Sequence, residues 1–144
     1  MFYLFIFCLF LAFYHLFLYG LLLKILPKRE KVVFAKKFQP SITILCPAYN
    51  EEKDIGAKIA SFLALAYPQK KMQLIIISDD SEDDTNAIVE SYAQKHSNIQ
   101  LLIQKPRRGK PSALNLAVPL VHSEIIVLTD ANSLIQKQTM RQLI

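Results

Sequence analysis

The first segment of the chain is continuously apolar. Residues 2–23 contain no charged side chain and consist mostly of Phe, Leu, Ile and Tyr. As a helix this segment would be about 33 Å long at ~1.5 Å per residue, slightly more than the roughly 30 Å hydrocarbon core of a membrane. It exceeds the roughly 7–15 apolar residues of a secretory signal peptide, and no small-residue cleavage site follows it. The pattern predicts a transmembrane helix over residues 1–26.

Basic side chains gather directly after the apolar segment. They are Lys24, Lys28, Arg29, Lys31, Lys36 and Lys37. By the positive-inside rule, they predict a single-pass membrane protein in which the residues after the apolar segment are cytoplasmic. Further spans are possible in a longer chain. They supply much of the net charge of +5, which suits contact with anionic lipid head groups. Basic and aromatic residues are not interleaved, so we expect no nucleic-acid partner. Residues 27–40, charged and with a proline at each end, are predicted to form a linker.

From position 41 onward, short apolar runs alternate with helical patterns. The predicted strands are residues 41–46, 72–78, 99–104 and 124–129. The predicted helices are residues 52–66, 84–95, 111–120 and 136–144. The strands are apolar without alternation, which is typical of parallel strands buried on both faces. This order predicts an α/β domain over residues 41–144, a Rossmann-like open parallel sheet with helices on both faces.

Polar residues follow each predicted strand. Residues 47–52 come after the first strand, Asp79 and Asp80 after the second, residues 105–110 after the third and residues 130–132 after the fourth. Because open α/β sheets bind ligands at the carboxyl ends of their strands, we expect these loops to share one site. Their carboxylates and cations suit a phosphorylated ligand held with a divalent cation. The phosphate-binding motifs G-x-G-x-x-G and G-x-x-x-x-G-K-[ST] are both missing.

At these residues the sequence resembles family 2 glycosyltransferases of the GT-A fold. The matching elements are Pro47-Ala48-Tyr49-Asn50-Glu51-Glu52, Tyr67-Pro68, Asp79-Asp80-Ser81, Asp84-Thr85, Gly109-Lys110 before Ala113-Leu114-Asn115, and Thr129-Asp130-Ala131-Asn132. Each motif is short, but six in the right order are specific. The resemblance covers residues 41–132 and implies the nucleotide-sugar-binding half of such an enzyme.

The resemblance implies a role for several loop residues. Tyr49 is expected to pack on the nucleotide base, with Pro47 and Glu51 beside it. Asp79 and Asp80 are expected at the same site, with Asp80 accepting a hydrogen bond from the imide of the base; alternatively, both only cap the following helix. Lys110 is expected near the diphosphate, where Arg107 or Arg108 adds positive charge.

Asp130-Ala131-Asn132 matches the Asp-any-Asp motif of the family. Positions i and i+2 of an extended segment point to the same side, so one side chain can meet the ribose and the other a metal ion. The resemblance therefore implies Mg²⁺ or Mn²⁺ at Asp130 and Asn132, although the amide of Asn132 adds no charge. A second departure is Ser81 where the family often has glycine. Loss of that glycine restricts a positive φ, so we expect the turn after Asp80 to differ.

The implied activity is inverting transfer of a sugar from a nucleotide-sugar donor, a UDP-sugar, to a saccharide or lipid acceptor at the cytoplasmic membrane face. No catalytic residue is assigned, because the resemblance implies a base downstream of Ile144. The sheet would also be left with an unpaired edge and an uncovered apolar face. We therefore expect a fragment of a longer enzyme. The alternatives are a non-catalytic, membrane-anchored nucleotide-binding or interaction module, and a membrane-anchored protein of another doubly wound family.

Overall fold

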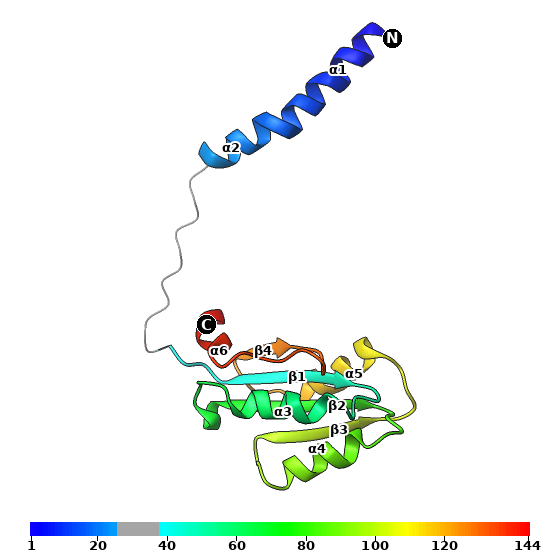
Figure 1. The fold of residues 1–144 in the computed structure, drawn as a ribbon, viewed down its shortest axis with the longest axis vertical. Coiled ribbons are helices and arrows are strands. Elements are labelled where there is room, and N and C mark those ends of the chain that lie inside the picture. The colour runs from blue at the N-terminus through cyan, green and yellow to red at the C-terminus, as the bar shows by residue number, and fades with distance from the viewer. Residues whose placement is uncertain (26–37) are drawn as a thin grey trace. The chain divides into compact units, whose positions relative to one another are not determined.

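The computed structural model describes residues 1–25 and 38–144 (Figure 1). The chain divides into two units, Met1–Phe34 and Ala35–Ile144, which are described separately. Residues 27–37 of the predicted linker lie outside the described residues.

The first unit is helical, as its apolar sequence favours. It consists of α1 (Phe2–Phe13), a π-helical segment η1 (Tyr14–Leu18) and α2 (Tyr19–Ile25). The π-helical segment divides the apolar run, so neither α-helix reaches the ~20 residues that a membrane span needs. Across residues 1–25 and 38–144, no helix combines the length and apolar character required to cross a membrane. The predicted transmembrane helix over residues 1–26 is therefore not found.

The second unit is built on a four-stranded sheet. Its strands are β1 (Ile42–Ala48), β2 (Met72–Asp79), β3 (Ile99–Gln104) and β4 (Ile125–Leu128). They lie in the order β3-β2-β1-β4, and every pair is parallel. The predicted open parallel sheet is confirmed. All four strands point the same way, so the loops that leave them meet at one edge.

Strand β1 is longer than predicted. Its pairing with β2 continues to Ala48 and Ser78, through Pro47, where the prediction ended at Cys46. Strand β4 pairs with β1 only as far as Leu45. At Pro47, β1 therefore has a neighbouring strand on one side alone, a position at which a sheet tolerates proline.

Helices pack on both faces of the sheet (Figure 1). The helices are α3 (Ile55–Leu63), α4 (Thr85–Ala93), α5 (Lys110–Ala117) and α6 (Thr139–Leu143), with 3₁₀ turns η2 (Gln69–Lys71) and η3 (Val118–Leu120). On one face, Ile44 and its neighbours pack against Phe62 of α3 and Val89 of α4. On the other face, Leu45 packs with Ala113 of α5. Alternate residues of β1 thus serve two cores, which explains the continuous apolar runs.

The sheet leaves part of one face open. Ile125 and Val127 of β4 pack against the larger core, whereas Ile126 and Leu128 on the opposite face are 40% and 57% exposed. Strand β4 has no second neighbour among the strands of residues 38–144. The expected unpaired edge and uncovered apolar face are both found at β4.

Candidate functional site

A pocket of about 290 Å³ lies at the carboxyl edge of the sheet. It is lined by Pro47, Ala48, Tyr49, Glu51, Asp79, Arg107, Gly109, Lys110, Asp130, Ala131 and Asn132. Residues from the ends of all four strands therefore meet in one place. Of the binding and metal residues predicted from the sequence, only Asp80 is not part of the lining.

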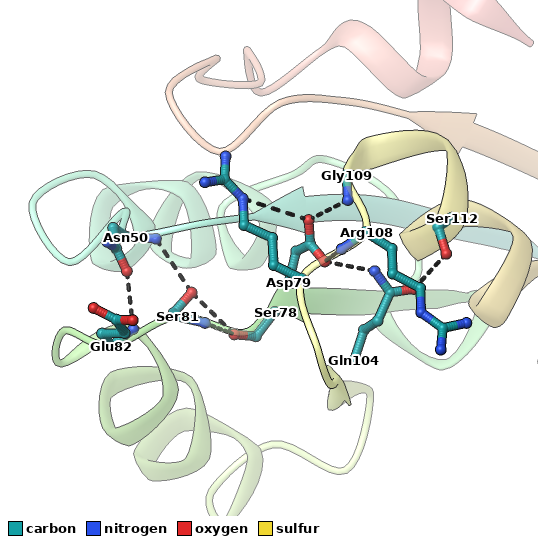
Figure 2. Close-up of polar contacts among 10 residues, drawn as sticks. Asn50, Ser78, Asp79, Ser81, Glu82, Gln104, Arg108, Gly109 and Ser112 are labelled. Atoms are coloured by element: carbon teal, nitrogen blue, oxygen red, sulfur yellow. Dashed lines mark hydrogen bonds and ion pairs between the residues drawn. The ribbon is translucent and has the colours of Figure 1, made fainter.

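Asp79 is the anchor of the loop that follows β3 (Figure 2). Its Oδ1 accepts hydrogen bonds from Gln104 Nε2 (2.5 Å) and the Arg108 amide (2.9 Å). Its Oδ2 accepts one from the Gly109 amide (2.7 Å), and Arg107 Nε lies 4.0 Å away. Both carboxylate oxygens are thus engaged by the chain itself, and Asp79 holds the cationic loop against the end of β2.

Gly109 meets a backbone requirement of this arrangement. Its φ of 84° and ψ of 167° lie in a region that residues with a Cβ atom rarely adopt. In this conformation its amide reaches Asp79, and the residue also serves as the N-cap of α5. The glycine therefore lets the loop approach the carboxylate and turn directly into the helix that begins with Lys110.

The hydrogen bonds to Asp79 outweigh the cost of its burial. Burial alone would raise the pKa of this carboxyl, but the Arg108 amide, Gln104, the Gly109 amide and the charge of Arg107 together lower it. A lowered folded-state pKa means that the carboxylate stabilises the fold above its unfolded pKa, roughly 3.9. That stabilisation is lost as the pH falls through the lower folded-state value.

Replacing Asp79 with asparagine tests this role. At neutral pH we expect the free energy of unfolding to fall by about 2 kcal/mol, because the amide removes the charge and turns a donor toward a backbone amide. The difference from the natural chain should shrink as the pH falls below about 4. Urea unfolding at several pH values measures it. Asp84→Asn, at an exposed position, is the control, and a pH-independent difference would contradict the assignment.

Asp80 lies beside the pocket lining rather than in it. It has a φ of 62°, and its Oδ1 is 3.9 Å from Lys105 Nζ. The left-handed residue of this turn is therefore Asp80 and not Ser81, since aspartate tolerates that region better than most residues. Ser81 is held within this turn: its Oγ lies 3.0 Å from Ser78 Oγ and accepts a hydrogen bond from the Asn50 amide (3.2 Å) (Figure 2). That the turn differs from the one usual in the family stays a prediction.

A different carboxylate, that of Asp83, accepts the backbone hydrogen bond at the start of α4. Asp83 Oδ1 accepts hydrogen bonds from the Thr85 amide (3.0 Å) and the Thr85 hydroxyl (2.5 Å). The alternative that Asp79 and Asp80 cap this helix is therefore not supported. Asp83 Oδ2 also accepts the Glu52 amide (3.0 Å), and Thr85 Oγ1 accepts the Glu51 amide (2.8 Å). These bonds join the loop after β1 to the loop after β2.

The joined loops set the positions of Tyr49 and Glu51. Asn50 between them has a φ of 53° and accepts a hydrogen bond from the Glu82 amide (2.9 Å). The pKa of Glu51 is raised, first by burial and then by the charges of Asp54, Asp83 and Asp130. Of these carboxylates, Glu51 and Asp130 both line the pocket, and a cation near them would offset their like charges.

Two cationic side chains that follow β3 contact other residues of the pocket lining. The Arg107 guanidinium lies over the ring of Tyr49, 3.6 Å from its centroid, and Lys110 Nζ contacts Asp130 Oδ1. The sequence left Arg107 and Arg108 as equal candidates. Only Arg107 lines the pocket, and no local signal distinguishes two adjacent arginines in a loop.

Asp130 and Asn132 offer a partial donor set for a divalent cation. They provide one carboxylate and one amide on the same rim of the pocket. Within residues 1–25 and 38–144, no cluster of three or more His, Cys, Asp or Glu side chains could hold a metal ion. Mg²⁺ commonly uses one or two carboxylates and completes its shell with phosphate oxygens and water. These residues therefore fit a metal ion that arrives with a diphosphate.

Several known proteins are similar to this chain in sequence and fold. A dolichyl-phosphate beta-glucosyltransferase, ALG5C, from Trichomonas vaginalis is 34% identical over 113 residues, 72% of this chain and 34% of the relative. The mannosyltransferase PcManGT from Pyrobaculum calidifontis, solved with GDP-Man and Mn²⁺, is 32% identical with a TM-score of 0.68, covering 72% of this chain and 31% of its own. TarS 1–349 of S. aureus in complex with UDP-GlcNAc is 26% identical with a TM-score of 0.66, covering 72% and 30%.

The chain spans about a third of the length of each of these three proteins. Residues 43–144, more than half of the chain, match the family described as Glycosyl transferase family 2. Fold and sequence therefore agree: the chain belongs to glycosyl transferase family 2 and has the open parallel α/β sheet of the GT-A fold.

Proposed function

We propose that the pocket binds the nucleoside diphosphate of a nucleotide-sugar donor, a UDP-sugar, and that the protein transfers the sugar to a saccharide or lipid acceptor. The observation that carries this proposal is the convergence of residues from all four strand ends on one pocket, with cations and carboxylates on facing loops. A single polar strand end would mean little, because loops are usually solvated.

Each loop has a distinct part in the proposed binding. The Tyr49 ring offers a flat surface on which a nucleotide base can stack. Arg107, now over that ring, has a planar guanidinium suited either to stacking or to pairing with phosphate. Lys110 would exchange its contact with Asp130 for the diphosphate. Asp80, which lies outside the pocket lining, would accept a hydrogen bond from the imide of the base.

Asp130 and Asn132 would hold Mg²⁺ or Mn²⁺ together with diphosphate oxygens. When bound, the ion supplies positive charge that stabilises the departing diphosphate. PcManGT was solved with GDP-Man and Mn²⁺, which supports the use of a divalent cation. The Asp130 and Asn132 side chains would orient the diphosphate at the rim, and Lys110 would neutralise the remaining charge.

The proposed reaction is a direct displacement with inversion. The acceptor hydroxyl oxygen forms a bond to the anomeric carbon while the bond from that carbon to the diphosphate breaks. The hydroxyl proton passes to a carboxylate base, for which we assign no described residue. A lipid acceptor is consistent with the relative named for dolichyl phosphate. The cytoplasmic membrane face stays a prediction from the basic residues at positions 24–37.

Isothermal titration calorimetry of the full chain tests the binding proposal. We expect saturable one-to-one binding of UDP with Mn²⁺, and affinity at least ~10-fold weaker without the ion, because the diphosphate then faces uncompensated carboxylates. GDP in place of UDP tests the choice of base, and inorganic pyrophosphate isolates the contribution of the diphosphate. A folded chain, checked by circular dichroism, that binds no nucleoside diphosphate would overturn the proposal.

A further inference from the structure

A lysine lies inside the core next to the pocket. Lys58 of α3 has 0% of its surface exposed, the same as the Ile55, Ile59 and Phe62 side chains on the same helix. Burying an ammonium group is costly unless its protons are hydrogen-bonded. A lysine placed three residues after Ile55 and four before Phe62 falls on the apolar face of the helix, and this is the sequence signal that marks it.

The Lys58 ammonium bonds to both ends of the loop that carries Asp130 and Asn132. Its Nζ donates to Thr129 Oγ1 (2.6 Å) and to the Ser133 carbonyl oxygen (2.5 Å). Thr129 directly precedes Asp130, and Ser133 directly follows Asn132. The Lys58 side chain therefore bridges the two ends of the loop, and it does not line the pocket.

Core packing and backbone hydrogen bonds also hold this loop in place. Ala131, between the two proposed metal-binding residues, is buried and packs in the larger core. The Thr129 amide donates to the Leu45 carbonyl (3.1 Å), and the Ser133 amide donates to the Asp130 carbonyl (3.2 Å). With Ala131 turned into the core and both ends fixed, the side chains of Asp130 and Asn132 are left on the pocket rim.

We propose that Lys58 is a positioning residue, which holds the Asp130–Asn132 loop in the geometry that binds a divalent cation together with a nucleoside diphosphate. The inference rests on the proposed function. A lysine that served stability alone would not need to bond both ends of this loop. Lys58→Met removes the buried charge but also leaves the Thr129 hydroxyl and the Ser133 carbonyl without this donor, which lowers stability. Unfolding is therefore measured beside binding, so that a loss of stability and a loss of positioning are distinguished.

The test compares UDP binding by the full chain with and without Mn²⁺. Lys58→Met should weaken Mn²⁺-dependent binding by about 10-fold, the range found when supporting residues of metal sites are removed. Metal-free UDP binding should change less than about twofold, because Tyr49, Arg107 and Lys110 lie on other loops. Lys53→Met, at an exposed position of the same region, is the matched control and should bind as the natural chain does.

A second variant covers the case in which Lys58→Met does not fold. Thr129→Val keeps the shape of the side chain but removes the hydroxyl that Lys58 bonds, and should cost about threefold in Mn²⁺-dependent binding alone. If both variants fold, the double variant should lose about 10-fold and not about 30-fold, because the two residues act through one contact.

The outcomes separate the two proposals. If the natural chain does not bind UDP with Mn²⁺, the proposed function fails. If the natural chain binds but folded Lys58→Met or Thr129→Val retains the full Mn²⁺-dependent affinity, the positioning role fails. Equal losses with and without Mn²⁺ would also overturn it, since they would indicate a general loss of structure.

Discussion

Replacing Asp130 with alanine is expected to weaken Mn²⁺-dependent UDP binding by about 100-fold, the upper range for perturbing a metal site. Asp130 is the only carboxylate of the two proposed metal-binding side chains, so the variant leaves a neutral amide at Asn132. Charge as well as an oxygen ligand is lost, and hard divalent cations depend on both. Calorimetric titration of UDP in the presence of excess Mn²⁺ measures the change.

The metal-free titration makes the prediction specific. Lys110 contacts Asp130 in the structure, so removal of the Asp130 carboxylate frees the Lys110 ammonium group for the diphosphate. Without Mn²⁺, we therefore expect UDP to bind the Asp130→Ala variant as well as the natural chain or up to a few-fold tighter. Asp84→Ala, at an exposed position away from the pocket lining, serves as the control. Unchanged affinity of Asp130→Ala with Mn²⁺ would remove the assigned metal site.

Truncating Phe62 to alanine is expected to lower the free energy of unfolding by about 3–5 kcal/mol, the usual cost of deleting a buried aromatic ring. Phe62 is fully buried in the larger core, which also contains Ile44 of β1 and Met140. Small domains are stable by only about 5–15 kcal/mol, so the change removes a large part of the total. Urea unfolding followed by circular dichroism measures it.

A matched truncation on the other face of the sheet gives the control. Leu116 of α5 is 44% exposed, and its replacement by alanine should cost less than about 1 kcal/mol. Similar losses for Phe62→Ala and Leu116→Ala would contradict the difference between a buried Phe62 and an exposed Leu116. Because Phe62 follows Lys58 by one helical turn, this experiment also measures how strongly α3 is held against the sheet.

The regular elements were predicted well where the evidence lay within the segment itself. Strand β3 has the predicted limits, Ile99 and Gln104. Strand β1 was placed correctly, but its end was wrong by two residues, because pairing with β2 carries it through Pro47. The predicted first helix began at residue 52, whereas α3 begins at Ile55. Glu52 is instead hydrogen-bonded to Asp83 and Asp84 of the loop after β2, a contact that its own sequence does not reveal.

The prediction of a transmembrane helix, in contrast, was not confirmed. Composition and length alone predicted a single span over residues 1–26, but the described segment is divided by the π-helical residues Tyr14–Leu18. Hydropathy averages over a segment and carries no information on where the helical hydrogen-bond pattern changes.

By itself, the amino-acid sequence determined the parallel α/β architecture and the edge of the sheet at which the ligand loops gather. Apolar runs, helical spacing and polar strand ends are local properties, and parallel strands necessarily bring their carboxyl ends together. Only the tertiary structure decided that Asp79 binds the neighbouring loop, that Arg107 and not Arg108 lines the pocket, and that Lys58 supports the Asp130 loop. These roles depend on contacts between residues that lie about 30 to 75 positions apart, and on charges whose burial the linear sequence does not define.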